Sequence, residues 1–242
     1  MGKTSNLATR IWLDQYDLSG YLNAADQNIK QELIPVTCFS DTGPRRIVGN
    51  YGYDTSMNSF NDFVDNLIDE IIFAHIAADT DHFLSHLWGA NVENSIAYDF
   101  VIRLLDQPRS GAVGGAQLLN LSADGANGCS RGLVLRNATI TGTGFGTGRN
   151  QGATTAGKIY QAVVRVFSGT FTSITIRIQE SSDDGAVDTY ADIATMTTTL
   201  TAAGVTRLTT TAATEAWKRV SVQAFTGTNA VIGVTSGVVA GS

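Results

Sequence analysis

Short segments of alternating apolar and polar residues, separated by turns rich in Gly, Ser, Asp and Pro, follow one another through most of this chain. The apolar positions favour β-branched and aromatic residues, which suit a pleated, half-buried surface. In the second half, strands are expected at 160–167, 171–180, 193–200, 205–211, 216–225 and 231–234, with Ser168-Gly169-Thr170 as a tight turn. A spacing of about 8 to 12 residues is typical of a sandwich or barrel. The pattern predicts a mainly β, antiparallel fold that is sandwich-like or barrel-like.

The stretch 11–63 organises the first half of the chain. It contains three expected strands, at 11–16, 29–39 and 45–53. Gly20 permits a positive φ in the turn after the first strand, and Gly43 with Pro44 marks a loop between the second and the third. The stretch therefore predicts three short strands that lead into a helix.

That helix is the clearest one in the sequence. Large apolar residues recur at helical spacing, at Phe63, Leu67, Ile68, Ile71 and Ile72. Acidic and amide residues fall on the opposite face, and Asn61 or Asp62 can cap the first turn. We therefore predict one α-helix, from about Asn61 to Ala78, packed on the flank of the sheet. For 82–88 a strand and a further helical turn stay equally open.

Two stretches rich in Gly, Ser, Ala and Thr, about 106–131 and 142–158, are expected to be long loops. The first is long enough to be a functional loop or an arm between subunits. The chain is otherwise expected to form a single domain over residues 1–242. A division into 1–105, with the first strands and the helix, and 132–242, with a β-meander, stays open.

The first quarter also carries an ordered set of motifs: DLSGYLN at 17–23, VTCFSDTG at 36–43 and RRIVGNYGYDTSMNSF at 45–60. This order resembles the amino-terminal signature of the major tail tube proteins of long, non-contractile phage tails. Those proteins typically read DLSGYLN, a strand, VT-F-D-G, R-I-G, a second strand, G-F and a helix. One departure is that Ser59 precedes Phe60, where the family usually has a smaller residue, often Gly.

The resemblance implies a tail tube fold with long assembly loops and no enzymatic activity or cofactor. Its subunits form rings, usually hexameric, that stack into a tube through which phage DNA is ejected. The implied partners are further copies of this chain, the tape measure and tail terminator proteins, and double-stranded DNA as a non-specific passenger. Such a protein is assembled in the host cytoplasm and ends in the tail of the virion.

The charge of the chain fits this implication without requiring it. A net charge of −6 argues against a nucleic-acid reader, which needs Lys and Arg for phosphate contacts. A conduit should lack such contacts, because they would hold the duplex, although mild acidity also serves solubility. Charged residues are 16% of the chain, below the roughly 25% of typical domains. A surface poor in charge suits contact between copies, but Thr-rich β-proteins of other functions share it.

Five residues are candidates for assembly contacts. Arg45 and Arg46 follow Pro44 at a turn in an otherwise acidic chain, so we expect them to face Asp side chains of another copy and not DNA. Gly111, Gly114 and Gly115 lie in the first Gly-rich stretch. Deletion of 110–115 is therefore expected to impair assembly more than folding.

Several motifs resemble nucleotide-binding or catalytic motifs, but the residues that follow or surround them do not fit such a site. Gly152–Lys158, GATTAGK, begins like a phosphate-binding loop, but Ile159 replaces the Ser or Thr that would hold magnesium. A strand and not a helix follows, so no helix N-terminus faces a phosphate. The glycines at 142, 144, 146 and 148 fail as a dinucleotide fingerprint for the same reason. No GxSxG nucleophile motif occurs, and a glycosidase carboxylate pair is a spatial feature that sequence does not show.

Metal sites are not expected either. His82 and His86, with Asp79 or Asp81 nearby, would face one zinc ion only on a helix, and a third ligand is not evident. Surface or interface histidines are the simpler interpretation, and His75 is expected to be a core or interface residue. Asp183, Asp184 and Asp188 lack the spacing of a calcium loop, which favours a turn with solvated carboxylates.

The remaining features concern location and alternatives. Cys38 and Cys129 are expected to be isolated buried thiols and not a disulfide. No run approaches the roughly 20 apolar residues of a membrane helix, and 1–8 do not resemble a signal peptide. Two other functions stay open. One is a capsid decoration protein, and the other is a carbohydrate-binding β-sandwich that uses Trp217 or Trp88 as a sugar platform.

Overall fold

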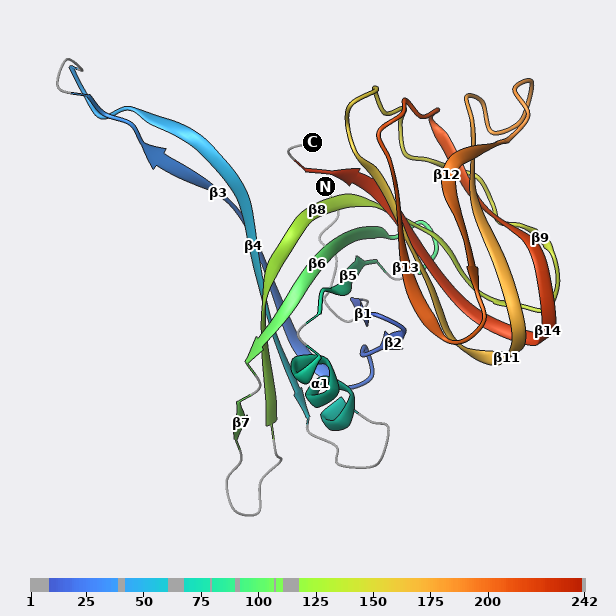
Figure 1. Ribbon diagram of the computed structural model, residues 1–242, viewed down its shortest axis with the longest axis horizontal. Helices are drawn as coiled ribbons and strands as arrows, with labels where there is room; N and C mark the ends of the chain where they lie inside the picture. Colours follow the sequence, from blue (N-terminus) through green and yellow to red (C-terminus); the bar gives the residue numbers. More distant parts are fainter. Residues whose placement is uncertain are drawn as a thin grey trace.

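The computed structural model describes residues 9–38, 42–60, 68–78, 80–89, 92–106, 108–110 and 118–240, and within them it contains one helix, α1 Ile68–Ala77 (Figure 1). The strands of the first half are β1 Arg10–Leu13, β2 Tyr16–Asp17, β3 Leu22–Pro35, β4 Arg46–Phe60, β5 His82–Trp88, β6 Ile96–Asp106 and β7 Arg109–Ser110. Those of the second half are β8 Leu118–Ile140, β9 Gly144–Phe145, β10 Arg149–Asn150, β11 Tyr160–Ser181, β12 Ala191–Leu200, β13 Gly204–Thr210 and β14 Trp217–Val239. None of the described helices is long and apolar enough to cross a membrane.

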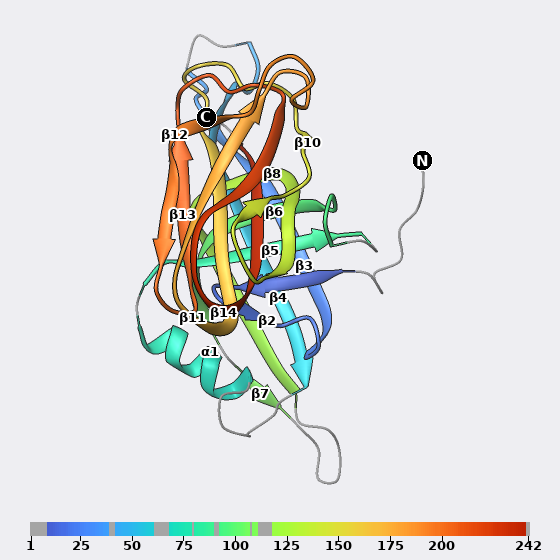
Figure 2. The same ribbon diagram turned by 90° about the vertical axis from the view of Figure 1, so that its right-hand side faces the viewer.

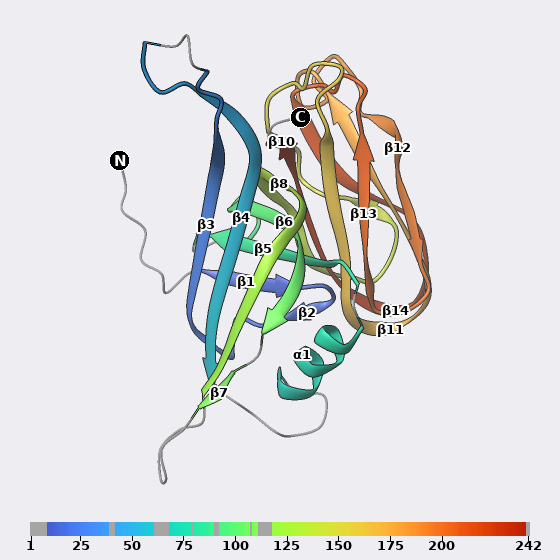
Figure 3. The ribbon, with the colours of Figure 1, turned by 60° about the vertical axis from the view of Figure 1, so that its left-hand side comes forward.

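The described strands all belong to one antiparallel sheet that curls on itself. Its main order is β12-β11-β14-β8-β6-β5-β1-β2, and β4 pairs with both β3 and β8. The curl brings the sheet of the second half opposite that of the first, with α1 below (Figure 3). In Figure 2, β5 runs across the direction of β11, β13 and β14. The prediction of a mainly β, antiparallel, barrel-like fold with one flanking helix is therefore confirmed.

Apolar side chains fill three clusters inside the curl. The largest joins the inner faces of β11, β12, β13 and β14 with the end of β8. A second lies under α1 and includes Ile68, Ile72, Leu84 and Ile102. A small third cluster around Trp12 and Val134 has Phe167 packed against it and lies where the two halves meet. Each half thus has its own core, and a seam of side chains connects them.

Helix α1 is shorter in the structure than the predicted range, since residues 61–67 lie outside the described part of the chain. Ile68 and Ile72, one turn apart, are fully buried, while Ile71 is only half-buried. The predicted apolar face is therefore confirmed at Ile68 and Ile72 and wrong for Ile71 as a core residue. Phe63 and Leu67 lie outside the described residues.

Replacing Ile72 by Ala is expected to lower the free energy of unfolding by about 2–5 kcal/mol, because truncation of a buried side chain leaves a cavity. Ile72 is 0% exposed, and its neighbour Phe73 on the same helix is 61% exposed. Phe73→Ala is thus a matched control with an expected change within about 0.5 kcal/mol. Chemical denaturation measures both variants. Equal losses would show that this face of α1 is not packed on the sheet.

The sequence placed the end of the third strand too early. Strand β4 continues to Phe60, so Ser59 and Phe60 extend a strand and do not open the helix. Asp54–Ser59 pairs with β3 on one side, and Asp54–Phe60 pairs with β8 on the other. Met57 and Ser59 are fully buried in this doubly paired stretch. Tertiary pairing outweighs the turn-like local composition there.

The Gly-rich stretch 106–131 is also not a loop over its described second part. Residues 118–131 belong to β8. Residues 82–88, for which a strand and a helical turn were both open, form strand β5. Small residues serve the packing of β8, because the ring of Tyr53 lies where a Cβ on Gly125 would be, at 2.2 Å. In the second expected loop, 142–158, the described strands are the two-residue β9 and β10.

The expected turn at Ser168-Gly169-Thr170 is a bulge inside one long strand. β11 runs through it and pairs with β14 along nearly its whole length, with register shifts around 166–173. Gly169 has a φ of 146°, and a Cβ there would lie 2.4 Å from the carbonyl oxygen of Asn229. Glycine therefore bends the strand without reversing it. The expected strands 160–167 and 171–180 are thus one strand of 22 residues, β11, and 216–225 and 231–234 are one strand of 23 residues, β14. The expected strands 193–200 and 205–211 are confirmed as β12 and β13.

Candidate assembly surface

The most distinctive surface is a two-stranded arm, defined here as residues 29–38 and 42–53, which extends from the body (Figures 1 and 3). It is the outer part of the β3–β4 hairpin, with Ile29 opposite Tyr53 at its base and Pro35 opposite Arg46 near its tip. Only the inner part of β4, Asp54–Phe60, pairs with a third strand. Among the described residues, the arm therefore has no third strand on either edge.

An arm of this kind needs a partner. Residues 29–35 extend over roughly 24 Å at about 3.4 Å per residue. Isolated two-stranded hairpins are marginally stable in water, and an open edge exposes unpaired N–H and C=O groups that another chain can bind. One ion pair, Lys30 Nζ to Asp54 Oδ2 at 2.8 Å, links the strands at the base. The backbone geometry alone thus favours binding of another strand or surface.

The side chains of the arm point to the same conclusion. Five of its large apolar residues are exposed: Ile29 39%, Leu33 52%, Ile34 40%, Val36 38% and Ile47 52%. Ile34 lies directly opposite Ile47, and Leu33 lies on the other face because successive strand residues point to opposite faces. Both faces of the arm are therefore apolar and open to water. Contiguous exposed apolar surface of this kind typically marks an interaction site.

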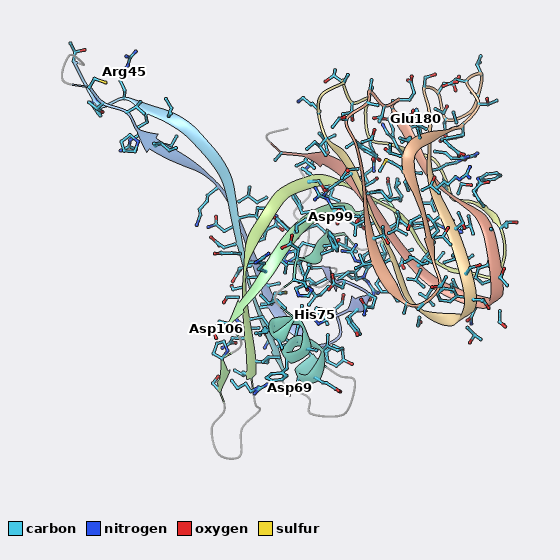
Figure 4. All side chains as sticks on the ribbon, in the orientation of Figure 1. Arg45, Asp69, His75, Asp99, Asp106 and Glu180 are labelled. Carbon is cyan, nitrogen blue, oxygen red and sulfur yellow. The ribbon has the colours of Figure 1, made fainter. Side chains whose placement is uncertain are left out.

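Positive charge lies at the tip of the arm. Arg45 and Arg46 are both exposed, and Figure 4 shows Arg45 at the end farthest from the body. The Arg45 backbone closes the tip, because its carbonyl accepts from Val36 N at 3.0 Å and its N–H donates to Thr37 Oγ1 at 3.0 Å. Arg45 and Arg46 thus place two positive charges at the tip of the arm, in a chain that is acidic as a whole.

The other predicted assembly residues have a different outcome. Gly111, Gly114 and Gly115 lie outside the described residues, so their role stays a prediction. The neighbouring Arg109, in β7, pairs with Asp69 of α1 at 2.8 Å. This ion pair links β7 to α1.

The motifs that resembled chemical sites serve the fold. Asp183 accepts hydrogen bonds from the N–H groups of Ala186, Val187 and Asp188, and Asp188 accepts one from Ser182 N. These carboxylates close a turn, as the sequence suggested. Residues 152–158 lead into β11 and not into a helix. Trp88 and Trp217, the suggested sugar platforms, are both half-buried.

The histidines are arranged differently from the zinc alternative considered above. His82 and His86 lie on strand β5, and Asp81 pairs with Arg103 at 3.0 Å. His86 packs between Trp88 and Phe100, and burial lowers the pKa of its ring to about 4. His82 instead contacts Asp14 and His75, two residues that the sequence did not connect with it. Cys38 and Cys129 do not form a disulfide, but only Cys129 is buried, so the expectation of a buried thiol is wrong for Cys38, which is exposed.

Comparison with known proteins finds similarity only among solved structures. No protein-family model matches the chain, and no curated protein sequence matches it significantly. A virion of a native gene transfer agent particle contains a chain with a TM-score of 0.44 and 15% identity, covering 53% of this chain and 98% of that one. The Dit (gp 19.1) protein of phage SPP1 has a TM-score of 0.36 and 11% identity, covering 94% and 98%. A chain of the phage p2 baseplate has a TM-score of 0.39 and 8% identity, covering 94% and 97%.

Proposed function

We propose that this chain is a structural subunit of a phage tail and that it self-assembles, through the arm, into rings that stack into a tube. The observation that carries the proposal is the arm, with two open edges and two apolar faces. The motifs of residues 11–63, which resemble those of tail tube proteins, supply the context. The motif at 17–23 ends in β3, and the motif at 45–60 forms β4, so two of the three resembling segments belong to the β3–β4 hairpin.

A second copy of this chain is the proposed occupant of the arm. The arm curves away from its own body, so its apolar faces are not covered by the described part of the same chain (Figure 1). In a ring, every copy presents an identical arm to an identical neighbour, so a single contact repeats until the ring closes. Strand edges paired in this way are no longer open to unspecific aggregation.

The finer parts of the proposal follow from the resemblance. Sixfold rings, a tape measure protein inside the tube, a tail terminator at its end and passage of double-stranded DNA are proposed on that basis. The net charge of −6 supports a lumen to which DNA does not adhere. The subunit is proposed to act without catalysis and without a cofactor, to be assembled in the host cytoplasm and to reside in the virion tail.

Electron microscopy and sedimentation of the purified full chain test the proposal. We expect rings or tubes whose proportion grows with protein concentration. A chain that stays monomeric at all concentrations would contradict self-assembly. Monomers that bind glycans would support the carbohydrate-binding alternative instead.

Charge reversal at the tip, Arg45→Glu with Arg46→Glu, is expected to weaken assembly by roughly tenfold at low salt, because tip arginines facing acidic groups of a neighbour would become repulsive. The loss should be smaller at high salt, where exposed charges are screened. Sedimentation at two ionic strengths measures both effects. Lys158→Glu, a charge reversal at an exposed lysine of the body, is the control. If the assembled double variant bound duplex DNA more weakly than the assembled parent, the assignment of Arg45 and Arg46 to contacts between subunits would be contradicted.

A further inference from the structure

Asp14, His75 and His82 meet at one point although they come from three segments. Asp14 lies in the turn between β1 and β2, His75 in the last turn of α1 and His82 at the start of β5. The Oδ2 atom of Asp14 lies 3.0 Å from His75 Nε2 and 2.7 Å from His82 Nδ1. Their side chains are only 9%, 11% and 6% exposed. Figure 4 shows His75 on the side of α1 that faces the body.

The outer nitrogen of each ring also faces an oxygen. His75 Nδ1 lies 2.6 Å from the carbonyl oxygen of Ile71, and His82 Nε2 lies 3.1 Å from that of His75. A carbonyl oxygen only accepts, so each outer nitrogen carries a hydrogen. In a neutral imidazole the inner nitrogen then has a lone pair, and both lone pairs point at the same carboxylate oxygen. Something positive must lie between them.

Two protons or one divalent cation would meet this requirement. Two protons would make both rings cationic at a centroid separation of 4.5 Å, which brings like charges together in a buried place. One divalent cation supplies the same total charge and leaves both rings neutral. A ligating histidine typically donates its other N–H to a carbonyl or carboxylate, which is the pattern found here for both rings.

The carboxylate is held in place for either occupant. Asp14 has a positive φ of 46°, and its N–H donates to Phe83 O at 2.9 Å while Arg165 Nε donates to its carbonyl at 2.8 Å. Its Oδ1 accepts from Phe83 N at 2.8 Å, which leaves Oδ2 directed at the rings.

We propose that Asp14, His75 and His82 bind one divalent cation of the zinc type, with a water molecule as fourth ligand. Two imidazole nitrogens and one carboxylate oxygen suit zinc, at about 2.0–2.2 Å each. The candidate ligand atoms all lie within 4.8 Å of one another, so an ion needs only a small expansion of the cluster. The ion would join α1 to the β1–β2 turn and to β5. In the described part of α1, Ile68 and Ile72 are the buried residues, so such a link would contribute much of its attachment.

Metal titration of the full chain tests this site. The chain contains three histidines, and the third, His86, is buried outside the cluster, which makes His86→Gln the matched control for His75→Gln. All variants carry Cys38→Ser, since an exposed thiol can bind zinc itself. After chelator treatment, zinc is added in a calorimeter, and cobalt is added in parallel because its visible absorption reports tetrahedral coordination.

We expect about one zinc per chain in the parent and in His86→Gln, with cobalt bands in the visible range. His75→Gln should weaken zinc binding by about 100-fold or more, since even loss of a hydrogen bond to a ligand costs about 10- to 100-fold. Zinc should raise the melting temperature of the parent and not that of His75→Gln. No zinc binding by the parent, or equal binding by a folded His75→Gln, would overturn the proposal. The measurement uses dissociated subunits, so its outcome is independent of self-assembly.

Discussion

Replacing Ile34 by Lys together with Ile47 by Glu is expected to give a folded subunit that no longer assembles. The two residues lie directly opposite each other in β3 and β4, at 40% and 52% exposure. An opposite-charge pair in this arrangement is compatible with the hairpin, so the arm keeps its structure. Its apolar face, however, becomes charged, and a neighbour would have to strip water from both charges to bind it.

The expected effect is large because the arm is the proposed contact of every copy with its neighbour. Fully burying an exposed isoleucine contributes about 1.5–3 kcal/mol, and Ile34 and Ile47 are about half exposed in the single subunit. Losing both therefore corresponds to a decrease in association of roughly 10- to 100-fold, to which the dehydration of the two new charges adds. Sedimentation measures the association, and thermal melts of the monomer check that its stability changes by less than about 1 kcal/mol. The melts separate a loss of assembly from a loss of folding.

Val187→Lys is the matched control for this prediction. Among the described residues, Val187 is the most exposed large apolar side chain, at 89%, and it lies in the β11–β12 turn and not on the arm. We expect this change to leave assembly intact. Equal loss of assembly in both variants would mean that surface apolarity in general, and not the arm, drives association. An arm variant that assembles like the parent would contradict the proposed contact.

The pattern of apolar and polar residues predicted those parts of the fold that depend on residues close together in the sequence. The strand class and the stripe that buries Ile68 and Ile72 are visible in the sequence because periodicity and burial coincide there. Strand lengths are not visible in the sequence, because Gly169 at a bulge and Gly43 between two strands look alike there. Only the pairing of β11 with β14 shows that the chain continues straight through Gly169. The same holds for Asp54–Phe60, whose composition resembles a turn but whose neighbours on both sides are strands.

The candidate sites depend even more on three-dimensional placement. Arg45 and Arg46 could be selected from a turn motif, but their position at the end of a projecting arm depends on where β4 leaves β8. Asp14 and His82 are 68 residues apart, so no spacing rule connects them. The assignment of no metal ligands rested on His82 and His86 as neighbours on a helix, whereas the partners of His82 come from other elements.

Arg165 is the buried side chain whose loss we expect to be most costly. It lies on β11 and is 0% exposed, yet its Nε donates to Asp14 O at 2.8 Å and its Nη2 to Phe83 O at 3.1 Å. These acceptors belong to the opposite wall of the curled sheet, far from β11 in the strand order. Its guanidinium also lies 5.8 Å from the centre of the Trp12 ring. Arg165 thus connects the two halves at their seam.

Arg165→Met is expected to lower the free energy of unfolding by about 3–5 kcal/mol. The change leaves the Asp14 carbonyl without this donor and removes a positive charge near the buried Asp99, and loss of one member of a buried charge pair typically costs that much. The control is Arg177→Met on the same strand, since Arg177 pairs with Asp192 at the surface, where an ion pair contributes about 0–1 kcal/mol. Urea denaturation measures both. A loss at Arg165 no greater than that at Arg177 would contradict its role at the seam.

The pH dependence of the stability lost in Arg165→Met identifies how much of this loss is due to Asp99. Burial raises the pKa of the Asp99 carboxyl, which accepts from Ser85 Oγ and from Thr235 Oγ1 at 2.7 Å, while the charge of Arg165 counteracts the rise. A carboxyl whose pKa is higher in the folded state stabilises the fold at low pH, and this contribution is lost as the pH rises through the folded value. Without Arg165 the folded pKa of Asp99 rises further, so the deficit of Arg165→Met should be smaller near pH 4 than near pH 7. Adding Asp99→Asn should remove this pH dependence and recover part of the stability. A deficit that is the same at both pH values would show that Arg165 stabilises the seam through its two carbonyl contacts and not through Asp99.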